Sequence, residues 1–245
     1  MQWILIVARL WGFVVAGLVL VWALFFKTSF LPRPSGAGGG DGDAVSHLDH
    51  IYSALHPLLM VIGFILLSGE AILVHRRFAC WSRSTRKSVH LLLQALALGF
   101  GLFGVWAKFR GNEGIVANFY SLHSWIGLAC LALFAYQWAA GFSTFWHKAE
   151  GRRTRSTVLP GHVGIGLYTF GLAVAAAETG LQEKLTFLQS HHGLGLRSPE
   201  SAFINSLGIA LALLAGVVVL AAVSPRNQQA AFGGGEESRN EKLHV

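Results

Sequence analysis

Charged residues and cysteines are both scarce in this sequence. Charged residues make up 13% of its 245 positions and hydrophobic residues 53%, a balance that argues against an ordinary soluble domain. The two cysteines, Cys80 and Cys130, have no paired spacing, and no C-x-x-C-H motif occurs. The sequence therefore contains no disulfide framework, no cysteine-based zinc site and no motif for covalent haem attachment.

Six long apolar runs contain most of the hydrophobic residues. They cover about residues 3–26, 52–74, 89–107, 119–146, 160–177 and 202–223. An apolar run of about 18 residues or more is long enough to cross a bilayer as a helix. The sequence therefore predicts an all-α, multi-pass integral membrane protein built as a six-helix transmembrane bundle.

The segments between these runs set the domain boundaries. We predict a first transmembrane helix at 1–27, a flexible loop at 28–50 and a four-helix core at 51–180. A loop and the sixth transmembrane helix follow at 181–224, and a disordered tail occupies 225–245. The loop at 28–50 is rich in Pro and Gly and the tail is polar and Gly-rich, compositions that do not form packed elements.

Basic residues are distributed unevenly over the connecting segments. Residues 75–88 and 147–157 contain nine Lys/Arg and a single acid, Glu150, whereas the connections on the other side contain six Lys/Arg and seven Asp/Glu. By the positive-inside rule, the two basic connections and both termini are expected in the cytoplasm. The net charge of +7 then reflects membrane orientation, and nucleic-acid binding is not expected.

Four of the predicted helices carry one histidine near their N-terminal ends: His56, His90, His123 and His162. An ionisable residue within the bilayer is costly and marks a functional site by default. Helices two and four begin on the non-cytoplasmic side, whereas helices three and five begin in the cytoplasm. His56 should therefore lie level with His123, and His90 level with His162. A single membrane histidine is as often a hydrogen-bonding residue as a ligand, but four at matched depths form a pattern.

A facing pair of imidazoles suits the two axial positions of a haem. Zinc and calcium sites need four or more ligands. A haem with two axial histidines has no open coordination position, so it transfers electrons, and without a C-x-x-C-H motif it binds non-covalently. We therefore predict two haems b, one between His56 and His123 and one between His90 and His162.

Several small or polar residues lie near the predicted ligands. Gly127 and Gly166 each follow a histidine by four residues, on the same helix face, and would leave room for a flat macrocycle. Glu70, Gln94 and Gln137 are polar at membrane depth. They are either hydrogen-bonding partners of the cytoplasmic haem site or polar residues of helix packing.

With these residues in place, the chain resembles the cytochrome b561 family over about residues 45–224. The resemblance rests on K-x-x-H at Lys87 to His90, Y-S-L-H-S-W at Tyr120 to Trp125, Y-Q-W at Tyr136 to Trp138, and the order Arg155, Pro160, His162. The E-K-L-T-F-L-Q run from Glu183 is similar to plant members. The resemblance implies a central four-helix bundle with two haems b, flanked by the first and sixth helices and often found as a homodimer.

The resemblance also implies two substrate sites. Cytoplasmic ascorbate would bind Arg83, Lys87 and Arg155 beside the inner haem. An acceptor on the other face, monodehydroascorbate or a ferric chelate, would meet Phe109, Arg110 and Tyr120. Arg110 stands where plant relatives tend to have histidine.

The function that follows is transmembrane electron transfer from cytoplasmic ascorbate through two bis-histidine haems b to a non-cytoplasmic one-electron acceptor. The protein would be an ascorbate-dependent transmembrane oxidoreductase of a vacuolar or other endomembrane. An alternative is a diheme membrane-anchor subunit that relays electrons in a larger redox complex. A histidine-lined metal or proton transporter is disfavoured, because the middles of helices three and five are mostly apolar.

Overall fold

The computed structural model describes residues 2–26, 51–52, 54–77, 81–110, 119–146, 151–191 and 193–224. All regular secondary structure in these ranges is helical. Six helices in them are long and apolar enough to cross a membrane, so the prediction of an all-α, six-helix membrane protein is confirmed. The predicted flexible loop at 28–50 and the predicted tail at 225–245 lie outside the described residues.

Helix boundaries follow the apolar runs closely for most of the chain. The second membrane helix, Ala54–Arg76, is made of a short helical segment, the π-helix η3 and α3. Two further π-helices extend α1 and α5. The described elements are α1 (Gln2–Val21), η1 (Trp22–Phe26), η3 (Leu59–Leu66), α3 (Leu67–Arg77), α4 (Arg83–Arg110), α5 (Leu122–Gly141), η5 (Phe142–Trp146), α6 (Arg152–His191) and α7 (Pro199–Val223).

Helix α6 is much longer than the sequence predicted. The predicted fifth helix covers 160–177 and the predicted loop begins at 181, whereas α6 runs over 40 residues with Pro160 inside it. The predicted loop is wrong as far as His191, because the hydropathy pattern reports where the membrane ends and not where the helix ends. Glu, Gln, Lys and Leu are good helix formers. Gly193, with φ of +63°, lies just beyond the helix end in a conformation that glycine tolerates.

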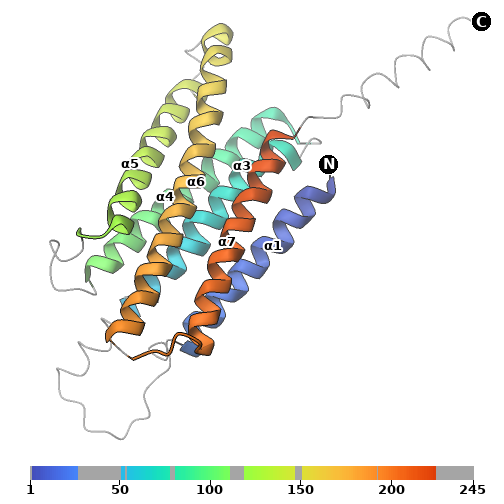
Figure 1. Ribbon diagram of the computed structural model, residues 1–245. Helices are drawn as coiled ribbons and strands as arrows, with labels where there is room; N and C mark the ends of the chain where they lie inside the picture. The colour runs from blue at the N-terminus through green and yellow to red at the C-terminus, as the bar shows by residue number, and fades with distance from the viewer. Residues whose placement is uncertain are drawn as a thin grey trace, which may run out of the picture.

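Two antiparallel hairpins form the centre of the bundle. The first hairpin consists of the second membrane helix and α4, and the second hairpin consists of α5 and α6; within each hairpin the two helices pack along their length. Figure 1 shows α5 and α6 along one side of the bundle and α1 and α7 along the opposite side. The first turn of α1, the first turn of α6 and the last turn of α7 lie at the same end of the bundle (Figure 1).

Polar contacts as well as packing join helices α1 and α7 to each other and α7 to the first hairpin. Trp11 Nε1 donates to the Ala210 carbonyl at 2.8 Å. At the end of α7, the Arg76 guanidinium donates to the carbonyls of Ala222 and Ser224. These carbonyls belong to the last turn of a helix, where no intrahelical donor is available. The side chain of Arg76 therefore caps α7 from α3.

An ion pair links α1 to α3 at membrane depth. Arg9 Nη2 lies 2.7 Å from Glu70 Oε2, and both residues are inside predicted membrane spans. The two alternatives for Glu70 were a partner of the haem site and a packing residue. Its partner in the structure is Arg9, a contact between helices that favours the second alternative.

Removing one partner of this pair should destabilise the bundle. In Glu70→Leu, the Arg9 guanidinium is left unpaired in a membrane helix, which costs at most about 2.5–3.5 kcal/mol, the value that insertion scales give for Arg at a helix centre. We expect a loss of that order in the free energy of unfolding, measured by equilibrium unfolding in lipid bicelles. The double variant Arg9→Leu/Glu70→Leu should recover most of the loss, because no unpaired charge is left. Equal losses in the single and double variants would contradict this account.

Candidate functional site

The four histidines singled out in the sequence meet as two pairs between the hairpins. The ring centroids of His56 and His123 are 6.1 Å apart, with 82° between the ring planes. Those of His90 and His162 are 6.4 Å apart, with 68° between the planes. Each pair takes one histidine from each hairpin. The pairing is the one expected from the topology, while the role of these residues as ligands stays a prediction.

Backbone carbonyls fix the orientation of three of the four rings. His56 Nδ1 lies 2.8 Å from the Gly104 carbonyl oxygen, His90 Nδ1 lies 2.8 Å from that of Ala71, and His123 Nδ1 lies 2.8 Å from that of Ala176. A carbonyl oxygen only accepts, so Nδ1 carries the proton in each case. The lone pair is then on Nε2, the arrangement typical of a metal-binding histidine oriented by a backbone carbonyl.

The distances within both pairs fit a haem between the rings. Imidazole nitrogen binds a first-row metal at about 2.0 Å, and the ring centroid lies about 1.1 Å behind the nitrogen. Two such ligands on opposite sides of one metal ion place their centroids about 6.2 Å apart. Within the described residues, no group of three or more His, Cys, Asp or Glu side chains is arranged to bind a metal ion. Two-ligand axial coordination of a haem is therefore the chemistry that these pairs fit.

The partner contacts follow one spacing in all four helices of the hairpins. Each helix has, 14 residues after its own histidine, a residue that hydrogen-bonds the histidine of its antiparallel neighbour; in the second membrane helix the spacing is 15. Fourteen residues are about four helical turns, or about 21 Å. The extra residue coincides with η3, since a π-turn takes in one residue more than an α-turn. These contact residues are Ala71, Gly104, Gln137 and Ala176.

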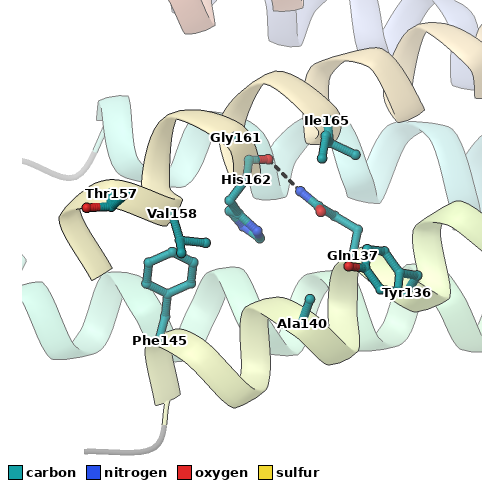
Figure 2. A pocket seen from close by; sticks show the side chains of 9 residues that line it. All are labelled: Tyr136, Gln137, Ala140, Phe145, Thr157, Val158, Gly161, His162 and Ile165. Carbon is teal, nitrogen blue, oxygen red and sulfur yellow. Dashed lines mark hydrogen bonds between the residues drawn. The ribbon is translucent and has the colours of Figure 1, made fainter. Parts of the chain in front are cut away.

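His162 differs from the other three histidines in its contacts. Its backbone carbonyl accepts a hydrogen bond from Gln137 Nε2, so Gln137 is a partner of this site. Figure 2 shows the His162 ring between Gln137 and Phe145, in a cavity of about 250 Å³ bounded by α5, η5 and α6. The Phe145 ring lies 5.1 Å from the His162 ring, centroid to centroid.

The glycines closest to the rings are not the ones that the sequence indicated. A Cβ on Gly127 would meet no atom within 4 Å, and one on Gly166 would only touch the Gln137 side chain at 3.5 Å. Gly141 lies directly against the His162 ring and Gly180 against the His123 ring. The closest approach to the rings therefore occurs across the hairpin and not along one helix, and the room that Gly127 and Gly166 would leave for a macrocycle stays a prediction.

Basic residues meet at the end of the bundle near His90 and His162. Arg83 is the first residue of α4, Lys87 lies one turn later, and Arg155 lies in the first turn of α6. The charges of Arg83 and Arg155 both act on Lys87, whose Nζ donates to the Phe145 carbonyl at 3.0 Å. Neither helix has an acidic residue in its first turn. Helix N-termini are partially positive, so this end of the bundle favours an anion.

The opposite end, near His56 and His123, has mixed charge. Phe109 packs on Phe119 with ring centroids 5.5 Å apart, and the Arg110 guanidinium lies 5.9 Å from the centroid of the Trp106 ring. Tyr120 is 78% exposed. The structure brings these predicted acceptor residues to the end of the bundle that carries His123, with Arg110 exposed.

Sequence reasoning missed a polar groove beside His123. The groove has a volume of about 370 Å³ and lies between the start of α5 and the last turns of α6. Glu183 lines it, and the charge of Glu183 also acts on Lys108 of α4. The groove was missed because its α6 side was predicted to be a loop. The remaining polar candidate, Gln94, has a buried Oε1 without a hydrogen-bond partner in the described part of the chain.

Comparison with known proteins adds a consistent result. Residues 55–188, which include all four paired histidines, match the family model described as eukaryotic cytochrome b561. The chain is 53% identical to "Probable transmembrane ascorbate ferrireductase 4" of Arabidopsis thaliana, over 96% of this chain and 89% of that protein. It is 42% identical to "Transmembrane ascorbate ferrireductase 2" of the same plant, over 91% of each chain. It is 38% identical to "Ascorbate-specific transmembrane electron transporter 2" of Zea mays, over 86% of this chain and 84% of that one.

Proposed function

The chain belongs to the eukaryotic cytochrome b561 family, and from this premise we propose that it is an ascorbate-dependent transmembrane oxidoreductase. It transfers electrons from cytoplasmic ascorbate to a one-electron acceptor on the other side of the membrane. The relatives support the donor, since their names specify ascorbate. Those names differ between ferrireductase and electron transporter, so the acceptor in this proposal is either a ferric chelate or monodehydroascorbate.

The observation that carries the proposal is the pairing of four histidines at two depths, with ring separations of 6.1 and 6.4 Å. In the proposal, His56 and His123 are axial ligands of one haem b, and His90 and His162 of a second. A haem b bound in this way supplies a one-electron iron couple with both axial positions filled. The residues of the chain orient the ligands, exclude water from the apolar bundle and bring charged substrates to its two ends.

The proposed orientation has both termini and the basic end in the cytoplasm. Support comes from the basic clusters of residues 75–88 and 147–157 and from the position of Lys87 and Arg155 near the inner pair. Vacuolar or other endomembrane location and a homodimeric state are parts of the proposal that rest on the family resemblance alone.

Arg83, Lys87 and Arg155 form the proposed ascorbate site. Ascorbate is a monoanion at neutral pH, and three cations at two helix N-termini attract it. Lys87 also connects this site to the inner pair, because it donates to the carbonyl of Phe145, whose ring contacts His162. An anion held by these residues is therefore one side chain away from a proposed ligand.

Phe109, Arg110 and Tyr120 form the proposed acceptor site on the other face. Monodehydroascorbate is an anion, as are many ferric chelates, and Arg110 is an exposed cation beside aromatic rings at that end. The groove with Glu183 lies on the α5–α6 side of the same end.

Replacing the histidines one at a time should test the pairing. His56→Ala and His123→Ala should each remove one and the same haem, and His90→Ala and His162→Ala the other, because each haem loses an axial ligand. Haem quantitation and redox-titrated visible spectra of purified protein measure this. His191→Ala, in an exposed histidine at the end of α6, should retain both haems. Loss of the same haem in the His56 and His90 variants would contradict the pairing.

Neutralising the proposed ascorbate site should slow reduction from the cytoplasmic side. Each charge-assisted hydrogen bond contributes about 1.5–3 kcal/mol, so Lys87→Ala/Arg155→Ala should weaken ascorbate binding by tens-fold or more. Stopped-flow reduction in oriented vesicles measures the rate. Arg152→Ala/Arg153→Ala removes the same charge from exposed positions of α6 and should have a much smaller effect. Equal effects of the two double variants would contradict a specific ascorbate site and would indicate general electrostatic attraction instead.

Neutralising Arg110 should affect the opposite step. Arg110→Gln should leave reduction by ascorbate unchanged and slow reoxidation by an anionic acceptor added from the non-cytoplasmic side, because only that side loses a positive charge. Reoxidation by an uncharged one-electron oxidant serves as the control and should not change. A slower ascorbate step in this variant would show that the two sites are not separated across the membrane.

A further inference from the structure

One position in each helix of the two hairpins lies about level with a histidine of the antiparallel neighbour. It follows the helix's own histidine by 18 residues, or by 19 in the second membrane helix, which contains η3. Eighteen residues are about five turns, so the position is on the same helix face as that histidine. We call these the ring-contact positions. They are His75, Lys108, Gly141 and Gly180.

The two hairpins fill these positions differently. In the first hairpin they carry large polar side chains: the His75 ring lies 5.1 Å from the His90 ring, centroid to centroid, and Lys108 lies one turn after Gly104, whose carbonyl contacts His56. In the second hairpin both positions are glycine. The histidine rings of α5 and α6 therefore lie against bare backbone.

The contact at both glycines is too close for any other residue. A Cβ on Gly141 would lie 2.8 Å from Cε1 of His162, and a Cβ on Gly180 would lie 2.8 Å from Cε1 and 2.9 Å from Nδ1 of His123. Separations below 3.0 Å essentially never occur for real Cβ atoms. A methyl group at either position would displace the ring or push the helices apart, and close-packed interiors transmit such a strain.

General helix packing does not account for these two glycines. Gly164 and Gly171 on α6 would each present a Cβ to open space, with no atom within 4 Å. Tight contact in this hairpin is therefore found at the ring-contact positions and not at glycines in general. One turn before each of these glycines, a hydrogen bond contacts the same histidine. Ala176 precedes Gly180 and contacts His123, and Gln137 precedes Gly141 and contacts His162.

We propose that Gly141 and Gly180 are positioning residues, each of which sets the ring position of one histidine in a separate cofactor site. Gly141 acts on the His90/His162 site through His162, and Gly180 acts on the His56/His123 site through His123. The inference rests on the proposed function, in which these pairs are haem ligands. It adds two residues that touch the ligands without binding the metal ion.

The physical consequence is control of the gap and the angle between paired rings. Each pair contains one ring from the second hairpin, so moving that ring changes the separations of 6.1 and 6.4 Å and the angles of 82° and 68°. The low-spin electron paramagnetic resonance signal of a haem with two imidazole ligands depends on the angle between their planes. That signal reports ring orientation independently of electron-transfer activity.

The test compares Gly141→Ala and Gly180→Ala with Gly164→Ala and Gly171→Ala in the purified full-length protein. Alanine forms helices better than glycine at all four positions, so a lost haem signal would not be caused by a lower helix propensity. We expect Gly141→Ala to shift or remove only the signal of the His90/His162 haem, and Gly180→Ala only that of the His56/His123 haem. The two control variants should retain both signals at the wild-type ratio of two haems per chain. The histidine variants described above assign each signal.

Each other outcome has a distinct meaning. Wild-type signals in both Gly141→Ala and Gly180→Ala would overturn the inference while leaving the proposed function intact. Loss or change of both signals in either variant would also overturn the inference, because the glycine would then support the whole hairpin. In the expected outcome, the haem that a variant retains shows that the variant is folded. Fewer than two haems in the wild-type protein would instead contradict the proposed function.

Discussion

An imidazole inside a membrane needs a partner for each polar atom, and backbone carbonyls supply it here. Buried polar groups without partners are costly in hydrocarbon, where no water replaces the lost hydrogen bond. The carbonyls of Ala71, Gly104 and Ala176 accept from His90, His56 and His123. These bonds fix the tautomer, so that the lone pair is on Nε2. The hydrogen bonds that orient these rings are therefore also contacts that pair the helices of a hairpin.

Contacts within the hairpins and contacts between them have different roles. Hydrogen bonds that orient the rings lie inside a hairpin, whereas the facing pairs form between hairpins. In each helix, about four turns separate its own histidine from the residue that contacts the histidine of the neighbouring helix. This spacing sets the two pairs about 21 Å apart along the bundle. The outer helices α1 and α7 bring no histidine to the pairs. They close the bundle through packing, the Trp11 hydrogen bond and the Arg9–Glu70 ion pair.

The helix count and the histidine pairing could be predicted from sequence, because hydropathy fixes which helices begin on the same side. Hydropathy could not predict the end of α6, since residues from Glu178 leave the apolar pattern without leaving the helix. Gly141 and Gly180 were missed for a related reason: i+4 reasoning considers one helix, and their contacts lie on the neighbouring one. The repeated 18-residue spacing from histidine to glycine in two consecutive helices was the available signal.

The difference between the hairpins follows from what each ring contacts. His56 and His90 have Lys108 and His75 at their ring-contact positions, and long side chains can adjust through rotamer changes. His123 and His162 lie against backbone, which cannot adjust without moving a helix. On the ring-contact side, the second hairpin therefore allows its histidine rings less adjustment than the first hairpin does. Because His56, His90 and His123 are also held through Nδ1 by backbone carbonyls, the ring of His162 depends most on this contact.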